Sequence, residues 1–600
     1  MGPGVKALIL AAGLGRRMAP LTDSTHKTLL PVAGTTILDR LLSSLRVCGI
    51  TDVCIVTGYR AGDIQAAVAE RFGDLNVQFV HNADYATTNN VFSMALALEN
   101  YEVDDDILLI ESDLIVDHKV IEQIVSSPHP NVALVDEYKV GMDGTVVSLG
   151  PGDVVRAVHP SYLQDSRFDF TDKYKTLNIY RFDRHFAATT LREMLSFYAR
   201  SIDAGCYYEL LLGVLIYMRA ATVHAEKVAH PWAEVDDPND LAAAQFVFNP
   251  AERRATVEAA WGGAWSLPYL DFNFIHNTYF PNEAMLAELR SSFDVVAFGY
   301  GSAQQVLDRK LSYFLGCEAS NVALLNGASQ AYPVLRDLYG SRRVLLPAPT
   351  FGEYTRIFPA ADTYPDHGRP EWDALNASSA DVVVVVNPNN PTGTVWETRG
   401  LLEVVRSQPG RVFVIDESFL DFSSQPSILA SVEAERLRNV VVLKSLSKCW
   451  GVPGLRLGYL HTLIPEVHEA LRKSTPIWNV NSLAEHFVEL ILKHRSPLEE
   501  SFARVIADRE ELAASLRSLP MVQRVFDSGA NFLLVRLGGD AALAGSLADR
   551  LMAERSIHVK DASAKFDDGA GYLRLAVRSP ADNKVLCEAL AELAGTRRQR

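Results

Sequence analysis

The stretch LILAAGLGRRMAPLT, residues 8–22, decides how the first half of this chain folds. Its apolar part, within residues 5–11, is typical of a buried β-strand, and Gly13 and Gly15 then allow a tight turn. Such a turn presents backbone N–H groups to an anion. The dinucleotide pattern GxGxxG needs a third small residue where Met18 stands, and the pattern GxxxxGK[ST] does not occur here.

Cationic side chains surround this turn. Arg16 and Arg17 follow it directly, and Lys27 comes soon afterwards in the segment HKTLLPV. Two arginines and a lysine suit a triphosphate better than a diphosphate bridge, because each cation can match phosphate oxygens. The alternative is an ordinary strand-to-helix turn with solvated arginines. We therefore predict a site for a phosphate-bearing molecule here.

Two acidic stretches predict a metal at the same site. DDILLIESD (105–113) carries a strand into Asp113, and WAEVDDPNDL (232–241) contains Asp236. A carboxylate at the C-terminal end of an α/β strand lies at the crevice where such sheets bind ligands. Magnesium favours one or two carboxylates together with phosphate oxygens, so we expect Asp113 and Asp236 to hold Mg²⁺. Each aspartate taken alone is more often a solvated loop residue or a helix cap.

Composition limits the class of protein. A chain of 600 residues is too long for one ordinary core. The net charge of -16 argues against nucleic acid as a partner, because phosphate backbones need a basic face. The six cysteines are scattered without a CxxC pair, which predicts neither a disulfide framework nor a zinc site. Without an apolar leader or a run long enough for a membrane span, we expect a cytoplasmic enzyme with no membrane partner.

Short apolar runs alternate with helical patterns in both halves, which predicts two different α/β domains with largely parallel sheets. We place the first domain at 1–247 and the second at 266–600. The loose, glycine-containing stretch at 248–265 is the predicted linker.

The first domain resembles the sugar-phosphate and choline-phosphate nucleotidyltransferases. Their signature LAAGxGxR followed by a lysine in KxLLPV matches Arg17 and Lys27, although His26 replaces the usual proline before the lysine. Three further motifs resemble the subset that attaches CMP to phosphocholine or 2-aminoethylphosphonate: TTNNVFSM (87–94), YKTLNIYRF (174–182) and CYYELLL (206–212). The resemblance implies a GT-A-like, Rossmann-like sheet and transfer of CMP from CTP with release of pyrophosphate.

The same resemblance assigns roles to individual residues. The nucleotide is expected at Ala11, Gly13, Gly15, Arg17 and Lys27, of which Arg17 and Lys27 neutralise the triphosphate and the leaving pyrophosphate. An acceptor with an anionic head and an ammonium needs a cation and acidic or aromatic company. The residues expected to supply these are Asn89, Lys175, Tyr208, Glu209, Trp232 and Glu234. For the tyrosines, core packing is an equally good interpretation.

LKSLSKCWGVPGLRLGY (443–459) indicates a different chemistry in the second half. Lys448 follows a predicted strand, with Ser445 before it and Arg456 after it. A lysine at a strand end suits covalent attachment of an aldehyde cofactor, and the hydroxyl and the arginine suit that cofactor's phosphate. Standing alone, such a lysine would be interpreted as a surface residue.

Other strand ends extend this second site. RVFVIDESF (411–419) contains Asp416, whose carboxylate can pair with a pyridinium nitrogen, and VVVVVNPNNPTG (382–393) contains Asn390. A helix N-terminus for phosphate and a ring to stack on the cofactor are predicted at Gly327, Ala328, Ser329 and Phe351.

This set, in this order, is similar to the fold-type I PLP aminotransferases, in particular histidinol-phosphate aminotransferase and threonine-phosphate decarboxylase. The resemblance covers about residues 266–596 and implies large and small subdomains, with PLP attached to Lys448 and Asp416 at the pyridinium. It places Asn390 at the ring hydroxyl, and it places Ser329, Ser445 and Arg456 at the phosphate. It places Asn277 and Arg574 at the substrate, with Arg574 binding a carboxylate. Tyr300 resembles the tyrosine that reaches a partner subunit's cofactor phosphate, which implies a homodimer.

One position departs from the aminotransferase pattern. A tyrosine usually stands three residues after the aspartate and bonds the ring hydroxyl, but here Phe419 occupies that position. Phe419 resembles the decarboxylase branch instead, so transamination and decarboxylation both stay open. Lys448 can carry the proton in either reaction.

The sequence therefore predicts a bifunctional enzyme: a CTP:2-aminoethylphosphonate cytidylyltransferase joined to an aminotransferase that forms the amine from phosphonoacetaldehyde and an amino-acid donor. One alternative is decarboxylation of a phosphorylated hydroxy-amino acid, followed by cytidylylation of the phospho-amino-alcohol. Another is phosphocholine activation beside an unrelated aminotransferase. A third is that one domain is a non-catalytic binding or dimerisation module.

Overall fold

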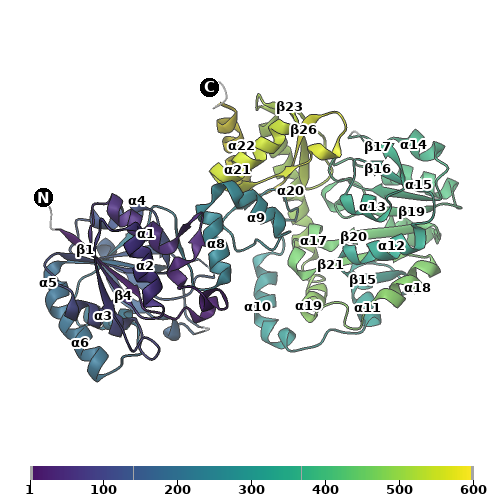
Figure 1. Cartoon of the computed structure of the whole chain (residues 1–600). Helices are drawn as coiled ribbons and strands as arrows, with labels where there is room; N and C mark the ends of the chain where they lie inside the picture. The colour runs from purple at the N-terminus through teal and green to yellow at the C-terminus, as the bar shows by residue number, and fades with distance from the viewer. Residues whose placement is uncertain (1–3, 140, 166, 367, 596–600) are drawn as a thin grey trace. The chain divides into compact units, whose positions relative to one another are not determined.

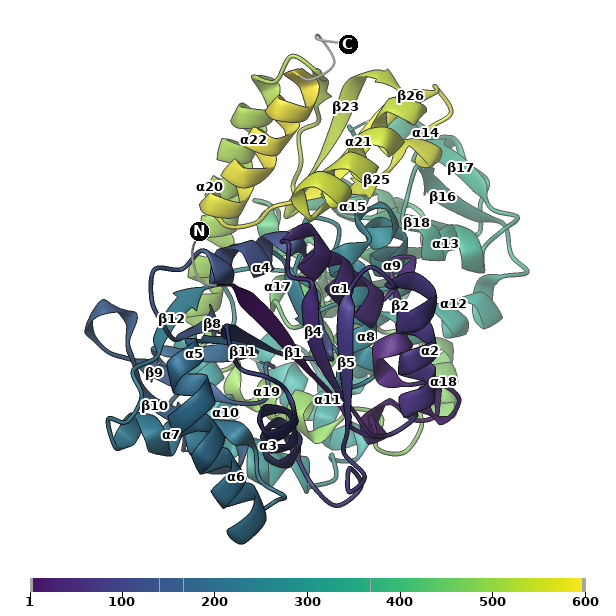
Figure 2. The same cartoon turned by 60° about the vertical axis from the view of Figure 1, so that its left-hand side comes forward.

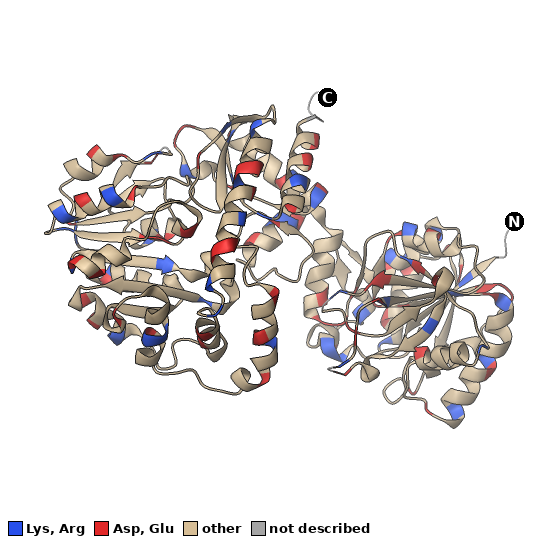
Figure 3. Cartoon of the chain, turned by 180° about the vertical axis from the view of Figure 1, so that it is seen from behind, with Lys and Arg blue, Asp and Glu red and all other residues tan. Residues whose placement is uncertain are grey.

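The computed structural model describes residues 4–139, 141–165, 167–366 and 368–595. By its internal contacts it divides into two compact units, Met1–Leu267 (unit 1) and Pro268–Arg600 (unit 2) (Figure 1). The stretch predicted as a linker, 248–265, contains helix α9 (Arg253–Ala259). Acidic and basic residues are interspersed over both units (Figure 3). Among the described residues, no helix combines the length and the apolarity that a membrane span requires.

Unit 1 contains a nine-stranded mixed sheet. The main path runs β10-β9-β11-β6-β1-β4-β5, and β8 pairs with both β11 and β12. The strands are β1 (Val5–Ala11), β4 (Asp52–Thr57), β5 (Asn76–His81), β6 (Asp106–Glu111), β8 (Val132–Glu137), β9 (Val146–Leu149), β10 (Val155–His159), β11 (Lys173–Phe182) and β12 (His224–Lys227). The sheet is parallel over β6-β1-β4-β5 as predicted, but β11 is antiparallel to β6, β8 and β9.

Helices cover both faces of this sheet. Successive residues of β1 point to opposite faces, so β1 contributes side chains to the core on each side. Leu8 and Leu10 pack with α3 (Asn90–Asn100), α6 (Arg192–Ser201) and α7 (Tyr208–Tyr217). Ala7 and Ile9 pack on the other face with α1 (Ile37–Val47), α2 (Ala61–Arg71) and α4 (His118–Val125) (Figure 2). The central strands are therefore buried on both sides, and the carboxyl ends of β1 and β6 lie next to each other.

A short antiparallel pair brings the second acidic stretch to that edge. β13 (Trp232–Glu234) pairs with β7 (Leu114–Val116), and the N–H of Val235 donates to the carbonyl of Asp113 at 3.0 Å. Helix α8 (Pro238–Phe248) follows, with a capping box between Asp237 and Asp240. The backbone is therefore held in place both before and after Asp236.

Unit 2 contains a seven-stranded sheet in the order β15-β21-β20-β19-β18-β16-β17. These strands are β15 (Val322–Asn326), β16 (Val344–Ala348), β17 (Asp362–Pro365), β18 (Val382–Val386), β19 (Val412–Asp416), β20 (Val440–Ser445) and β21 (Leu457–Thr462). β21 runs in the opposite direction to the other six strands. The helices around it include α10 (Glu283–Ala297), α11 (Gln304–Leu315), α12 (Ala331–Tyr339), α13 (Gly352–Ile357), α15 (Thr398–Ser407), α17 (Leu446–Cys449), α18 (Pro465–Ser474) and α19 (Ser482–Leu490).

A smaller antiparallel sheet follows the long helix α20 (Arg495–Arg517). It consists of β22 (Val522–Val525), β23 (Phe532–Asp540), β26 (Ala570–Ala576) and β25 (Lys560–Asp561), in that order. Helices α21 (Ala541–Arg555) and α22 (Pro580–Gly595) belong to the same part of the chain. Unit 2 thus has a large and a small α/β portion.

Candidate functional sites

A cavity of about 490 Å³ lies at the glycine turn of unit 1. Its lining combines cationic, acidic and amide side chains, including Arg16, Arg17, Lys27, Asn89, Asn90, Glu111, Asp113, Asn178, Glu209, Glu234 and Asp236. Gly15 has a φ of 59°, in the left-handed region that favours glycine, and the short helix with Arg17 begins directly after it. The turn therefore places Arg16 and Arg17 at the carboxyl ends of the central strands.

Lys27 joins the two aspartates predicted to bind metal. Its Nζ donates to Asp113 Oδ2 at 2.9 Å and to Asp236 Oδ1 at 2.7 Å, while Arg17 Nη2 lies 2.7 Å from Asp236 Oδ2. Burial opposes the charge on Lys27, but the two carboxylates outweigh burial and raise its pKa. The structure thus brings together four residues that are distant in sequence.

His26 occupies the position at which the related signature has a proline, and it stabilises the following turn with its side chain. Its Nδ1 accepts a hydrogen bond from the N–H of Thr28 at 3.2 Å, which caps the turn that carries Lys27. Burial lowers the pKa of His26 to about 4, so the ring stays neutral and keeps a lone pair for this bond. His26 therefore acts as a positioning residue for Lys27.

The donor set suits magnesium. Oδ1 of Asp113 is buried and accepts no hydrogen bond from the described residues, so one carboxylate oxygen is left without a partner. Oxygen ligands from one or two carboxylates, completed by phosphate oxygens and water, are what Mg²⁺ prefers. Asp113 and Asp236 are the side chains that would hold it.

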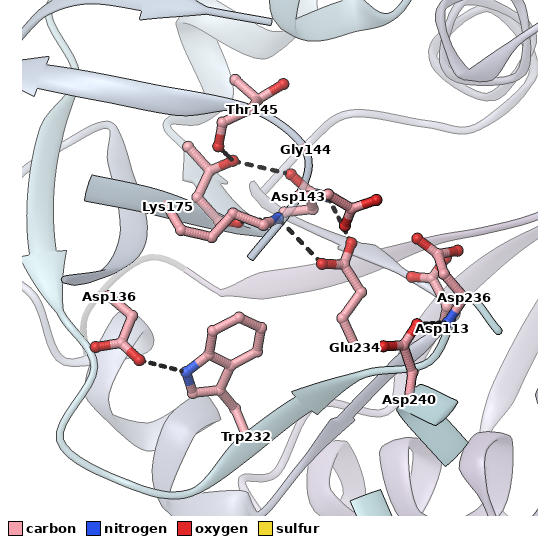
Figure 4. Close-up of polar contacts among 12 residues, drawn as sticks. Asp113, Asp136, Asp143, Gly144, Thr145, Lys175, Trp232, Glu234, Asp236 and Asp240 are labelled. Carbon is pink, nitrogen blue, oxygen red and sulfur yellow. Dashed lines mark hydrogen bonds and ion pairs between the residues drawn. The ribbon is translucent and has the colours of Figure 1, made fainter. Parts of the chain in front are cut away.

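Three glutamates also line this cavity, namely Glu111, Glu209 and Glu234. Asn90 connects two of them, because its Nδ2 donates to Glu111 Oε1 at 3.0 Å and more weakly to Glu209 Oε2 at 3.4 Å. Burial raises the pKa of Glu234 to about 7, an effect that the charge of Lys175 partly offsets. Lys175 Nζ lies 3.1 Å from Glu234 Oε2 (Figure 4). The cavity wall is strongly acidic here.

The predicted site residues of unit 1 separate into two groups. Asn89, Glu209 and Glu234 line the cavity with the turn residues. Lys175, Tyr208 and Trp232 are not among its lining residues. The side chain of Lys175 is only 2% exposed, and Trp232 Nε1 donates to Asp136 Oδ2 at 3.1 Å (Figure 4).

The second site lies at the strand ends of unit 2, around a buried aspartate. Asp416 ends β19 and is 4% exposed. Its Oδ2 accepts a hydrogen bond from Tyr354 Oη at 2.8 Å, and its Oδ1 accepts one from the N–H of Ser418 at 3.0 Å. Burial raises the pKa of Asp416, and these hydrogen bonds oppose that rise. A buried acceptor of this kind suits a pyridinium N–H.

Lys448 lies on the short helix α17, which follows β20 as predicted. Burial lowers the pKa of Lys448 to about 8, aided by the charges of Arg574 and Arg456 and opposed by Asp416. A lysine with a lowered pKa has more of the neutral amine that attacks an aldehyde carbon.

The phosphate end of this site is built around Gly327. Its φ of 79° requires glycine, and a Cβ there would lie 2.5 Å from Arg456 Nη2. Arg456 Nη2 also donates to Ser329 Oγ at 3.3 Å. Ala328 and Ser329 belong to the 3₁₀ turn that leads into α12, and the N–H of Ser445 donates to Ser418 Oγ at 2.9 Å. These residues fit a PLP phosphate.

The other predicted residues of unit 2 have different settings. Asn390 Oδ1 accepts a hydrogen bond from Arg574 Nη1 at 2.9 Å. Asn277 is 1% exposed, and its side chain donates to Cys449 O and Ser501 Oγ, so it fixes the backbone beside Lys448. Phe351 caps α13 with a partly exposed ring. Tyr300 is 83% exposed and stacks on Trp478.

Family comparison identifies both halves. Residues 7–174 match the model of the MobA-like NTP transferase domain, and residues 273–590 match that of aminotransferase class I and II. The chain belongs to the class I and II aminotransferase family. A MobA-like nucleotidyltransferase domain with a mixed α/β sheet precedes its aminotransferase domain, which has the fold-type I architecture.

Some relatives match nearly the whole of this chain, and others match only about half of it. CMP-5'-(3-aminopropyl)phosphonate synthase of Streptomyces rubellomurinus is 33% identical over 609 residues, covering 98% of this chain and 95% of that protein. Histidinol-phosphate aminotransferase of Thermococcus gammatolerans is 28% identical over 292 residues, covering 47% of this chain and 78% of that protein. The crystal structure of L-threonine-O-3-phosphate decarboxylase from Porphyromonas gingivalis is 23% identical, with a TM-score of 0.49 over 54% of this chain and 99% of that one.

Sequence reasoning missed several residues of the two sites in this fusion. Glu111 and Asn90 line the cavity, and the signal for Glu111 was its place two residues before Asp113 at the same strand end. Tyr354 lies three residues after the predicted Phe351, but its hydrogen bond to Asp416 spans 62 residues of sequence. A contact between residues so far apart in sequence leaves no periodic pattern that could predict it.

The pKa of Lys448 predicts how the apoenzyme captures PLP. The neutral amine is the reactive form, so capture is slow below the pKa and levels off above it. We expect the rate constant to rise about ten-fold from about pH 6 to about pH 7 and to flatten above about pH 8. Growth of the visible absorbance after mixing apoenzyme with PLP measures it. A rate still rising ten-fold per pH unit above pH 9 would contradict a lowered pKa.

Proposed function

We propose that the nucleotidyltransferase domain transfers the cytidylyl group of CTP, with Mg²⁺, to the phosphonate or phosphate oxygen of a small amine, and that the aminotransferase domain uses PLP to form that amine. The observation that carries the proposal is a single cavity that holds Arg17, Lys27, Asp113 and Asp236 together with an acidic wall. The Streptomyces relative, named for a CMP-aminopropylphosphonate, supports CTP and a phosphonate acceptor. The preferred acceptor is 2-aminoethylphosphonate.

The first reaction is an in-line displacement at phosphorus. The acceptor oxygen attacks the α-phosphorus of CTP, the bond from that phosphorus to the bridging oxygen breaks, and pyrophosphate leaves. Positioning and charge neutralisation dominate such transfers. Arg17 and Lys27 would neutralise the triphosphate and the leaving pyrophosphate, while Asp113 and Asp236 would hold the metal. Bound Mg²⁺ would act as a Lewis acid toward the phosphate oxygens.

The acidic wall favours a primary amine in the acceptor. Glu111, Glu209 and Glu234 offer carboxylate oxygens to ammonium N–H donors. A quaternary ammonium has no such donors and needs aromatic faces instead. Of the described lining residues, only Tyr85 and Tyr207 carry a phenol ring. We therefore favour 2-aminoethylphosphonate or a phospho-amino-alcohol over phosphocholine.

The second reaction, in the preferred form, moves an amino group from an amino acid to the aldehyde carbon of phosphonoacetaldehyde. The donor becomes a 2-oxo acid and the aldehyde becomes 2-aminoethylphosphonate. PLP, when bound, supplies an electron sink for the carbon that carries the amine. Asp416 would keep the ring nitrogen protonated, and Lys448 would move the proton at that carbon. Arg574 would bind the donor's carboxylate.

Decarboxylation is the second candidate, and Phe419 favours it. Its ring is buried in a small apolar cluster and meets Phe532 edge-on, with the ring centroids 5.2 Å apart. Phe419 offers no hydroxyl to the cofactor ring. In this candidate, a phosphorylated amino acid loses CO₂ and gains a proton at the same carbon, giving the amine directly.

Restoring the tyrosine tests the choice. We expect Phe419→Tyr to raise the ratio of transaminated to decarboxylated product by about three- to ten-fold, the worth of one added hydrogen bond. Product ratios by mass spectrometry measure this, with Phe502→Tyr, on α20, as a control. An unchanged ratio with a folded, PLP-loaded variant would show that position 419 does not govern the choice.

We further propose a homodimer formed through the aminotransferase domain. Exposed apolar side chains occur in and after α10, including Phe293, Val295, Phe298 and Tyr300. Surfaces of this kind are typical of protein–protein contacts. In such a dimer Tyr300 would reach the partner subunit's cofactor phosphate. The molar mass of the full-length protein by light scattering tests this, and a monomer at micromolar concentration would overturn it.

Pyrophosphate release tests the first activity. The full-length protein would be given CTP, Mg²⁺ and one of four acceptors: 2-aminoethylphosphonate, phosphoethanolamine, aminopropanol phosphate or phosphocholine. We expect release to require both CTP and acceptor and to be fastest with 2-aminoethylphosphonate. Preference for phosphoethanolamine or aminopropanol phosphate would favour the decarboxylase candidate. Preference for phosphocholine would overturn the assignment of a primary amine as acceptor.

A further inference from the structure

Two arginines of the aminotransferase domain have neutral hydrogen-bond partners. Arg574 lies on β26, and Arg578 lies just beyond the end of that strand. The N–H of Val577 donates to Asn531 O at 2.9 Å, so pairing continues past residue 576. Residues four apart in extended chain point to the same side, with Cα atoms roughly 13 Å apart. The side chains of Arg574 and Arg578 therefore lie on the same side of the small sheet.

Neither guanidinium forms an ion pair with a carboxylate of the described residues, although the charge of Asp271 acts on Arg574 from a greater distance. Arg574 donates to Asn390 Oδ1 at 2.9 Å and to Asn273 O at 2.6 Å, and Arg578 Nη1 donates to His276 Nε2 at 3.2 Å. The Nε atoms of both arginines are buried and make no hydrogen bond to any described residue. Burying donors and charge without a counter-ion is costly. This arrangement is what a site for anionic ligands requires.

His276 fixes the direction of Arg578 and places it near Lys448. Because His276 Nε2 accepts the arginine's hydrogen bond, the imidazole there is neutral. Burial, followed by the charges of Arg578 and Lys448, lowers the pKa of His276 to about 4. The next residue, Asn277, donates its N–H to Lys448 O at 2.9 Å. The Arg578–His276 pair is therefore tied to the backbone of the PLP lysine.

We propose that Arg578, oriented by His276, binds the phosphonate or phosphate group of the amine that the aminotransferase domain processes, and that Arg574 binds a carboxylate. The inference rests on the proposed function, in which this domain acts on amines through PLP. Arg578 is then a specificity-determining residue and His276 its positioning residue. The substrate class is a short-chain amine, aldehyde or amino acid that carries a tetrahedral phosphorus anion.

The two arginines have different uses in the two candidate reactions. In transamination the donor amino acid engages Arg574, and the phosphorus-bearing partner engages Arg578, in separate half-reactions. In decarboxylation one substrate engages both, because it carries a carboxylate and a phosphorus anion together. In either case, loss of Arg578 affects only the substrate that contains phosphorus.

The test compares Arg578→Gln with Arg574→Gln in the full-length, PLP-loaded enzyme. Glutamine keeps hydrogen-bonding capacity and removes the charge. We expect Arg578→Gln to raise the KM for the aminoalkylphosphonate by about 10- to 100-fold, with a smaller change in kcat, because a charge-assisted contact is lost. The KM for a phosphorus-free amino-acid donor should change less than two-fold. Arg574→Gln should show the opposite selectivity.

A binding readout separates this role from a merely structural one. Inorganic phosphate would be titrated into the loaded enzyme and followed at the visible absorbance of bound PLP, which reports the aminotransferase domain alone. We expect the phosphate-dependent change to be lost in Arg578→Gln and weakened in His276→Ala. In His276→Gln, an amide oxygen can again accept from Arg578, so binding should be restored in part. Arg399→Gln, an exposed arginine paired with Glu403, is the control and should behave as the wild type.

The outcomes distinguish this inference from the proposed function. If the wild type turns over aminoalkylphosphonate and Arg578→Gln does so with unchanged KM, the anion assignment is wrong and the proposed function stands. If phosphate binds through Arg578 but no amine with phosphorus is turned over, the anion site is real and the proposed function fails. If Arg578→Gln impairs the amino-acid donor equally, Arg578 is not selective and the inference is overturned.

Discussion

Replacing Asp113 with asparagine should lower CTP turnover by about 10³-fold or more, because a metal ligand and the counter-ion of Lys27 are lost in one step. Asp113 Oδ2 lies 2.9 Å from Lys27 Nζ, and its other oxygen has no partner among the described residues. An amide at this position offers a weaker ligand and leaves the lysine charge paired with Asp236 alone. The measurement is pyrophosphate release with CTP, Mg²⁺ and 2-aminoethylphosphonate.

Two controls make the Asp113 result specific. Asp117→Asn changes the same residue type at the N-cap of α4, where asparagine caps equally well, and should leave turnover unchanged. The PLP absorbance and the amine chemistry of the Asp113 variant should match those of the wild type. CTP turnover retained within about three-fold would contradict the metal role of Asp113.

Replacing Lys448 with alanine should abolish covalent PLP attachment and lower amine turnover by at least about 10⁴-fold. The amine at position 448 is both the attachment point and the proposed proton carrier, so its loss removes both roles. The visible absorbance should disappear from protein that has been passed through a desalting column. Cytidylyl transfer to amine supplied from outside should continue at the wild-type rate.

The control for Lys448 is Lys473→Ala, an exposed lysine on α18 that pairs with Glu469. It should retain both activities and the absorbance. A Lys448→Ala protein that still holds PLP through desalting, or still forms amine, would show that another residue carries the chemistry. A variant that also loses cytidylyl transfer would indicate misfolding and require Lys448→Arg in its place, with the same expectations.

Much of the fold could be predicted because apolar runs mark buried strands directly. The strand predicted within residues 5–11 is β1, DDILLIESD contains β6, and the expected site at their carboxyl ends coincides with the cavity. Motif spacing also brought Lys27, Asp113 and Asp236 into one prediction, and the structure places them in hydrogen-bond contact. Strand direction was harder, since an antiparallel strand such as β11 has the same apolar period as a parallel one.

The acceptor side of the cavity could be predicted only in part. CYYELLL predicted acceptor contacts from both Tyr208 and Glu209, but the start of α7 turns only Glu209 and Tyr207 toward the cavity and buries Tyr208 in the core. Lys175 and Trp232 are engaged by Glu234 and Asp136, contacts that join residues about 60 and 100 positions apart. Glu111 could have been found from its strand end, whereas its contact with Asn90 depends on tertiary packing.

The most direct measurement is a ³¹P NMR spectrum of the full-length protein incubated with CTP, Mg²⁺ and 2-aminoethylphosphonate. Cytidylyl transfer joins the phosphonate phosphorus to the α-phosphorus of CTP through one oxygen. We predict that the phosphonate singlet is replaced by two mutually coupled doublets while pyrophosphate appears in equal amount. A phosphonate signal that stays a singlet while CTP is consumed, or a mixture in which neither substrate changes, would contradict the assignment of the unit 1 cavity to this reaction.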